Sequence, residues 1–168
     1  MNEFDAFYRS HLRLVYAMAL ARGLPFCTAE DLTQETFLRA WRHFGLLSGM
    51  EPPAQRAWLI RVLRNLESDG WRSGRLTARE APVWSNGEEH ATEPPQDPAL
   101  RLDVARALAG LAETDREVVV LRYFLQMNSR EIGEALQMPE GTVRRKLMEC
   151  RSYLAERLAP WGPGGDRS

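Results

Sequence analysis

The chain has 168 residues, of which 44% are hydrophobic and 27% charged, and its formal net charge is −1. This composition excludes a wholly disordered or collagen-like chain. The longest uncharged apolar stretch, Leu14 to Ala21, is far shorter than the ~20 residues that a transmembrane helix needs. Two cysteines, Cys27 and Cys150, are too few and too far apart for a disulfide framework or a zinc site. We therefore expect no membrane insertion, and the lack of a basic and apolar leader favours a cytoplasmic location.

The charge is distributed unevenly along the chain. Residues 1–75 carry +2, residues 76–100 carry −4 and residues 101–168 carry +1. Two weakly basic blocks are thus separated by an acidic spacer that is rich in proline, and such a spacer buries too little apolar surface to fold. We predict two small domains with a flexible linker and a flexible tail, at residues 1–75, 76–98 (linker), 99–158 and 159–168 (tail).

The first block is predicted to hold three helices, because apolar residues recur there at intervals of three and four. These helices are expected at residues 3–22, 29–44 and 54–72, with a loop from Gly45 to Pro53 between the last two. Ser68 and Gly70 are poor helix formers for their positions, and Gly costs about 1 kcal/mol inside a helix. They predict that the third helix ends early.

The second block is predicted to hold four helices, at residues 98–111, 114–125, 132–136 and 139–158. Thr114 with Glu117, and Asn128 with Glu131, have the spacing of a capping box at a helix start. A short helix, a tight turn and a longer helix in this order are typical of a helix-turn-helix motif. Neither block shows the alternating pattern of a strand, so the predicted fold class is all-α.

Two helix faces are candidates for nucleic-acid binding. On the third helix and just beyond it, one aromatic ring adjoins a row of arginine and amide side chains, which suits base stacking and phosphate binding. These residues are Trp58, Arg61, Arg64, Asn65, Ser68, Arg72 and Arg75. On the last helix, the residues near its start would reach base edges in the major groove. That face comprises Thr142, Arg144, Arg145, Lys146, Glu149, Arg151 and Ser152. Ordinary solvent-exposed helix faces remain the alternative for both.

Residues for catalysis are not evident in the sequence. His11, His43 and His90 are scattered, with no carboxylate or cysteine arranged around them, and there is no phosphate-binding loop or metal-ligand cluster. We predict that the chain is not an enzyme and that it uses no metal and no cofactor. Cys27 and Cys150 are interpreted as buried structural thiols.

Several segments resemble a known family. Ala29-Glu-Asp-Leu-Thr-Gln-Glu-Thr-Phe-Leu-Arg-Ala-Trp-Arg42 and Trp58-Leu-Ile-Arg-Val-Leu-Arg-Asn-Leu66 are similar to region 2 of bacterial RNA polymerase sigma factors. Pro139-Glu-Gly-Thr-Val143, with Leu147, Arg151 and Leu154, resembles region 4. Two such regions joined only by a spacer look like the extracytoplasmic-function (ECF) group of the sigma-70 family.

The resemblance implies a role for each face. One face of the second helix would bind the β′ clamp of core RNA polymerase: Asp31, Gln34, Glu35, Leu38 and Arg42. The third helix would meet the minus-ten promoter element, the loop Gly45 to Gln55 would hold a flipped-out base, and the last helix would read the minus-thirty-five element. The β flap of the polymerase, promoter DNA and an anti-sigma protein are the partners that the resemblance implies.

Two other functions are compatible with parts of the sequence. A regulator similar to the LuxR type would explain residues 114–154, but it leaves Ala29 to Arg42 unexplained. A sigma-like interaction protein that does not drive transcription is favoured only by a thin basic cluster at Arg72 to Arg75.

Two residues depart from the pattern of the family that the chain resembles. Gln137 stands where the turn of the helix-turn-helix motif commonly has Gly, and Glu149 stands where a basic residue is frequent on the recognition face.

Overall fold

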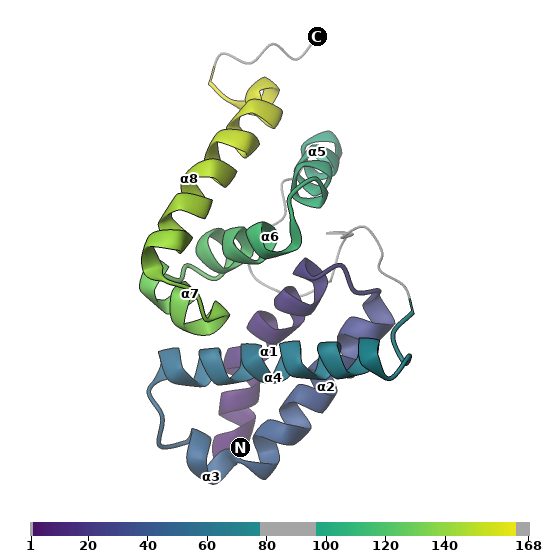
Figure 1. Ribbon diagram of the computed structural model, residues 1–168, viewed down its shortest axis with the longest axis vertical. Helices are drawn as coiled ribbons and strands as arrows, with labels where there is room; N and C mark the ends of the chain where they lie inside the picture. The colour runs from purple at the N-terminus through teal and green to yellow at the C-terminus, as the bar shows by residue number, and fades with distance from the viewer. Residues whose placement is uncertain (1, 78–96, 164–168) are drawn as a thin grey trace.

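The computed structural model describes residues 2–77 and 97–163, and within these ranges the regular structure is helical throughout. Figure 1 shows α1 to α4 grouped together, with α5 to α8 stacked on one side of them. The elements are α1 (Glu3–Ala21), α2 (Phe26–Arg42), α3 (Phe44–Leu47), α4 (Pro52–Arg72), α5 (Pro98–Ala109), α6 (Glu113–Val119), η1 (Val120–Phe124), α7 (Ser129–Leu136), α8 (Glu140–Arg157) and η2 (Ala159–Trp161). Of the predicted linker at residues 76–98, residues 78–96 lie outside the described residues, and His90 is among them.

The first three long helices form as their apolar stripes predict, with changes at their ends. A capping box formed by Asn2 and Asp5 starts α1. The second helix begins at Phe26 rather than at residue 29, because the carbonyl of Pro25 already accepts the first helical hydrogen bond, from the N–H of Ala29. The expected loop from Gly45 to Pro53 contains the short helix α3, whose Leu47 is fully buried.

The prediction that the third helix ends early is wrong. Helix α4 continues through Gly70 to Arg72. The chain then folds back, and Leu76 donates its N–H to the carbonyl of Gly70 at 3.1 Å. A Cβ atom at residue 70 would lie 2.8 Å from both Cγ and Cδ1 of Leu76. Gly70 therefore makes room for Leu76, and its cost in helix propensity is offset by this contact.

We call α1 to α4 the first module and α5 to α8 the second module. The second module contains the predicted helix-turn-helix, formed by α7 and α8. Asn128 and Glu131 form the predicted capping box at the start of α7. The capping box predicted for Thr114 and Glu117 is wrong, because α6 begins at Glu113 and its N-cap, Ala112, makes no side-chain cap. The helix then continues to Phe124 as a π-helical turn. Gln137 ends α7 in the left-handed conformation, with φ 56° and ψ 46°.

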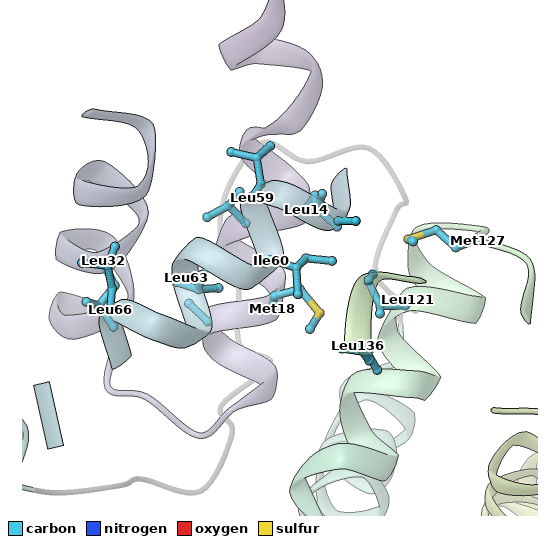
Figure 2. Close-up of a cluster of buried hydrophobic side chains, with 14 of the residues drawn as sticks. Leu14, Met18, Leu32, Leu59, Ile60, Leu63, Leu66, Leu121, Met127 and Leu136 are labelled. Carbon is cyan, nitrogen blue, oxygen red and sulfur yellow. The ribbon is translucent and has the colours of Figure 1, made fainter. Parts of the chain in front are cut away.

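The two modules share one hydrophobic core. Figure 2 shows Met18 of α1 and Ile60 of α4 on the side that faces Leu121 and Leu136 of the second module. All four side chains are buried, and Ile60 and Leu121 expose nothing to solvent. Burying one such side chain contributes about 1.5–3 kcal/mol to the free energy of folding. The contact among these four side chains therefore stabilises the packing of the two modules against each other.

The segment expected to be a flexible tail from residue 159 onward starts with an ordered turn. Ala159–Trp161 form the 3-10 helix η2, and the indole N–H of Trp161 donates to Asp103 Oδ2 at 3.0 Å. This difference from the expectation arises because the half-buried indole is held against α5.

Candidate polymerase and nucleic-acid interfaces

The face of α2 that the resemblance assigns to the polymerase is open to solvent. Asp31, Gln34, Leu38 and Arg42 are exposed, and Glu35 is half-buried beside Arg39. The buried side of the same helix holds Leu32, Phe37 and other residues of the core, which fixes the orientation of the polar side. An exposed leucine among charged residues suits a protein interface that has a small apolar centre and a polar rim.

A second apolar side chain on α2 was not predicted. The indole of Trp41 is 55% exposed and lies edge-on against Phe4, with the ring centroids 4.9 Å apart. Leu38 is 52% exposed, so α2 presents two large apolar residues three positions apart. The spacing of Leu38 and Trp41 on one side of the helix was the signal in the sequence that could have revealed this feature.

The predicted minus-ten residues lie mainly on an open face of α4. Arg61, Asn65, Ser68, Arg72 and Arg75 are exposed. Two members of the set differ from these because they are half-buried. Trp58 packs against the core, near the imidazole of His43, and Arg64 is turned toward the second module.

The segment from Gly45 to Gln55 is held at both ends. Leu47 is buried, and the side-chain amide of Gln55 donates to the carbonyl of Leu47 at 2.9 Å. Most of the residues between these anchors are exposed, and Leu46, just before the first anchor, is 59% accessible. A loop that is fixed at its base and open at its surface can present a preformed pocket wall to a ligand.

The predicted recognition face on α8 is split by the structure. Arg144, Arg145, Glu149, Arg151 and Ser152 are exposed, whereas Thr142 and Lys146 are half-buried. Within α8, Arg144 pairs with Glu140, and Arg145 pairs with Glu149 at 3.9 Å. Lys146 points back and forms an ion pair with Asp115 of α6 at 2.6 Å. The arginines are therefore the cations of this face that are available to a ligand.

Sequence reasoning missed a buried ionic cluster between the modules. Arg22, at the end of α1, forms ion pairs with Glu67 of α4 and with Glu113 and Glu117 of α6. Glu67 and Glu117 are almost fully buried. Burial opposes the charged form of Arg22, but the carboxylates of Glu117 and Glu67 outweigh it and raise the pKa of Arg22 above its usual value. No local sequence pattern reveals this cluster, because its members lie up to 95 positions apart.

The two cysteines differ in their surroundings. The interpretation of Cys27 as a buried thiol is wrong, because Cys27 is exposed in the first turn of α2, whereas Cys150 is buried as predicted. Burial, followed by the charge of Asp115, raises the pKa of the Cys150 thiol to about 11. Across residues 2–77 and 97–163, no group of three or more histidine, cysteine or acidic side chains could hold a metal ion. In the same residues no helix is long and apolar enough to cross a membrane.

Comparison with known proteins agrees with this arrangement. Residues 7–77 match the family Sigma-70 region 2, and residues 101–154 match Sigma-70, region 4. The ECF RNA polymerase sigma factor SigL of Mycobacterium tuberculosis is 34% identical over 144 residues, which cover 84% of this chain and 81% of SigL. The RNA polymerase sigma-E factor of Streptomyces coelicolor is 34% identical over 133 residues, covering 77% of this chain and 71% of that protein.

Solved structures share the fold. The sigma factor RpoE of Bartonella quintana, solved in complex with the anti-sigma factor NepR, aligns with a TM-score of 0.70 and 21% identity over 95% of this chain and 98% of RpoE. CnrH, solved in complex with the cytosolic domain of CnrY, aligns with a TM-score of 0.62 and 24% identity over 93% of this chain and 87% of CnrH. From the two family matches and the identity with SigL, the chain belongs to the ECF sigma factors of the sigma-70 family.

Proposed function

We propose that this sigma factor binds core RNA polymerase through α2 and directs it to promoters through α4 and α8. In this proposal residues 1–75 form the region 2 module, and residues 99–158 form the region 4 module. The observation that supports the proposal most strongly is that both regions occur in order in one chain, and that most residues of each proposed face are exposed. A LuxR-type regulator would need only α6 to α8 and would leave the α2 face without a role.

The α2 face has the composition of a docking surface for a basic and apolar partner. Asp31 and Glu35 supply negative charge, and Leu38 with Trp41 supplies apolar area. Charge complementarity of this kind speeds association and fixes the register of a complex, while buried apolar side chains provide affinity. The β′ clamp of the polymerase is the proposed occupant of this face.

Promoter melting requires energy that this chain can supply by binding. Extruding a base from the duplex costs a few kcal/mol. Stacking on an aromatic side chain returns about 1–3 kcal/mol per base, and arginines add phosphate contacts. In the proposal, Arg61, Asn65 and Arg72 of α4 hold the backbone of the minus-ten strand, and the anchored loop from Gly45 to Gln55 receives an extruded base.

The upstream element would be read by α8. Its N-terminal half enters the major groove in a helix-turn-helix complex, so the exposed guanidinium groups of Arg144 and Arg145 are placed for guanine or phosphate contacts. Glu149 suits the amino group of a cytosine. Further partners in the proposal are the β flap of the polymerase and an anti-sigma protein, since RpoE and CnrH were both solved with proteins that bind them.

In this proposal the polymerase catalyses RNA synthesis, so the chain itself has no catalytic activity. The chain acts in the cytoplasm, where transcription takes place.

The test is transcription in vitro from a library of randomised promoters, with purified core enzyme and this chain. We expect transcripts to come from templates enriched in two elements near minus ten and minus thirty-five. A sigma-like interaction protein would bind the core enzyme without producing transcripts. A LuxR-type regulator would not bind the core enzyme at all.

A further inference from the structure

Three consecutive cations lie in the N-terminal half of α8, and each has an acidic partner. Arg144 and Arg145 each pair with a glutamate four positions away on the same helix. Lys146 instead pairs with Asp115, which lies in the first turn of α6. Helix α6 packs against α8 (Figure 1), so this third ion pair joins two helices. The three cations therefore differ in what holds them.

The ion pairs also differ in their exposure to solvent. The side chains of Arg145 and its glutamate are 63% and 60% exposed, so both charges stay hydrated and their attraction is weak. The side chains of Lys146 and Asp115 are only 24% and 25% exposed, and their charged atoms lie 2.6 Å apart. Attraction at this separation is screened less when solvent is partly excluded. The arginines can thus exchange their partners for DNA more readily than Lys146 can.

Lys146 lies at the edge of the proposed reading face of α8. It is four positions after Thr142 and three before Glu149, so it shares a side of the helix with both. A lysine is a point charge on a flexible stem and can bind any phosphate within its reach. Asp115 directs the ammonium toward α6 instead. The backbone of Asp115 is itself fixed there, because its carbonyl accepts a hydrogen bond from the buried thiol of Cys150 at 3.9 Å.

We propose that Asp115 is a positioning residue for DNA binding by α8: it holds the ammonium of Lys146 against α6 and so prevents one contact with a DNA phosphate. The inference rests on the proposed function, in which α8 binds DNA. A phosphate contact is the same for every sequence, whereas contacts with base edges distinguish sequences. Asp115 therefore lowers the affinity of α8 for DNA of any sequence, and a larger share of the binding energy comes from Arg145 and Glu149.

The first measurement is the affinity of the full chain for a mixed-sequence DNA duplex over a series of salt concentrations. Asp115→Asn keeps the size of the side chain but removes the charge that holds Lys146. Its binding should be tighter by about five- to tenfold at ~0.1 M salt, and its salt dependence should steepen by about 0.9, the effect of one further phosphate contact. Asp115→Glu keeps the charge and should restore the wild-type salt dependence. Glu156→Gln is the matched control, because it removes one negative charge from an exposed position near the other end of α8.

The second measurement detects the ammonium group directly, because Lys146 is the only lysine of the chain. The probe is a duplex that contains abasic sites, whose deoxyribose aldehyde forms an imine with a lysine amine and releases water. Cyanoborohydride then transfers hydride to the imine carbon and makes the crosslink permanent. The N-terminal amine can react in the same way, so Lys146→Gln gives the background. Asp115→Asn should crosslink well above the wild type, and Asp115→Asn combined with Lys146→Gln should return to the background.

Two results would overturn the proposal. One is that Asp115→Asn, folded by circular dichroism, binds the duplex no more tightly than Glu156→Gln does. The other is tighter binding without additional crosslinking, which would assign the gain to the loss of a repelling carboxylate. If Asp115→Asn does not fold, Asp115→Gln replaces it, because Gln is the better helix former. Arg144→Gln removes an exposed cation of α8 and should weaken binding to the same duplex if α8 contacts DNA. Failure of the proposed function would therefore show in Arg144→Gln and in the transcription assay, apart from the result for Asp115→Asn.

Discussion

The Nζ atom of Lys146 on α8 lies 2.6 Å from Oδ1 of Asp115, and this ion pair links α8 to α6. Its neighbour Arg145 points to solvent and pairs only with Glu149 of the same helix among the described residues. Two adjacent cations on one helix thus have different surroundings. Substitution of Arg145 should therefore affect DNA recognition, whereas substitution of Lys146 should affect the stability of the fold.

Arg145→Ala should weaken recognition of the upstream element by about 1–3 kcal/mol at one or two base pairs. Lys146→Ala should instead lower the free energy of unfolding by about 0.2–1 kcal/mol, the range of a partly exposed ion pair. Binding of both variants to a panel of single-base promoter variants, together with urea unfolding, measures the two effects. An equal loss for Arg145→Ala on every sequence would make that residue a phosphate contact.

Local patterns predicted the helices but not the contacts between modules. The stripes of α1, α2 and α4 and the capping box at Asn128 follow from residues three or four positions apart, so they could be recognised in the sequence. Glu117 has the same local spacing from Thr114, yet it is buried against Arg22, and only the tertiary fold brings those two residues together. Gly70 was misjudged for a similar reason, because Leu76 reaches it only after the chain turns back.

In the candidate site, too, the direction of a side chain could be predicted from local spacing, but its partners on other helices could not. Outward-facing residues such as Asp31, Arg61 and Arg145 could be placed from helical periodicity, because a helix that buries one stripe exposes the opposite one. Lys146 and Arg64 were assigned to the same open faces, but each has a partner on another helix. Periodicity gives the direction of a side chain from its own axis and contains no information about neighbouring helices.

Gln137→Gly should stabilise the protein by about 0.5–1 kcal/mol. A left-handed conformation costs a non-glycine residue about 1–2 kcal/mol, and Gly avoids this cost. Part of the gain is lost because Gly also raises the conformational entropy of the unfolded chain. The position ends α7 with φ 56°. For a chain of this size the midpoint of thermal unfolding should rise by about 1–4 °C. Glu134→Gly, at an exposed position inside α7, is the control, and it should destabilise by about 1 kcal/mol. A loss of stability in Gln137→Gly would show that the Gln side chain makes a compensating contact.

His11 should make the stability depend on pH in the mildly acidic range. Burial lowers its pKa below the usual 6.5, the nearby charge of Arg56 acts in the same direction, and the hydrogen bond to the carbonyl of Phe7 opposes them only partly. The unfolded chain therefore binds a proton more readily than the folded chain. The stabilisation is complete above the unfolded pKa and is lost as the pH falls through 6.5 toward the folded pKa.

Urea unfolding at about pH 7.5 and about pH 5.5 measures this loss. His11→Gln should remove that part of the pH dependence, while His43→Gln, at an exposed position, should retain it. An unchanged pH dependence in His11→Gln would assign the effect to other groups.

Asp31→Arg should abolish binding to core RNA polymerase while the fold survives, because Asp31 is exposed on α2 and takes no part in the core. Placing a like charge in a complementary interface costs several kcal/mol, which corresponds to a loss of at least about a hundredfold in affinity. Pull-down of core enzyme measures binding, and circular dichroism with thermal unfolding measures the fold. Glu156→Arg is the matched reversal on α8 and should bind core enzyme as the wild type does. If Asp31→Arg retained core enzyme in full, the polymerase would have to dock elsewhere, and Leu38 with Trp41 would lose the role that their exposure on α2 suggests.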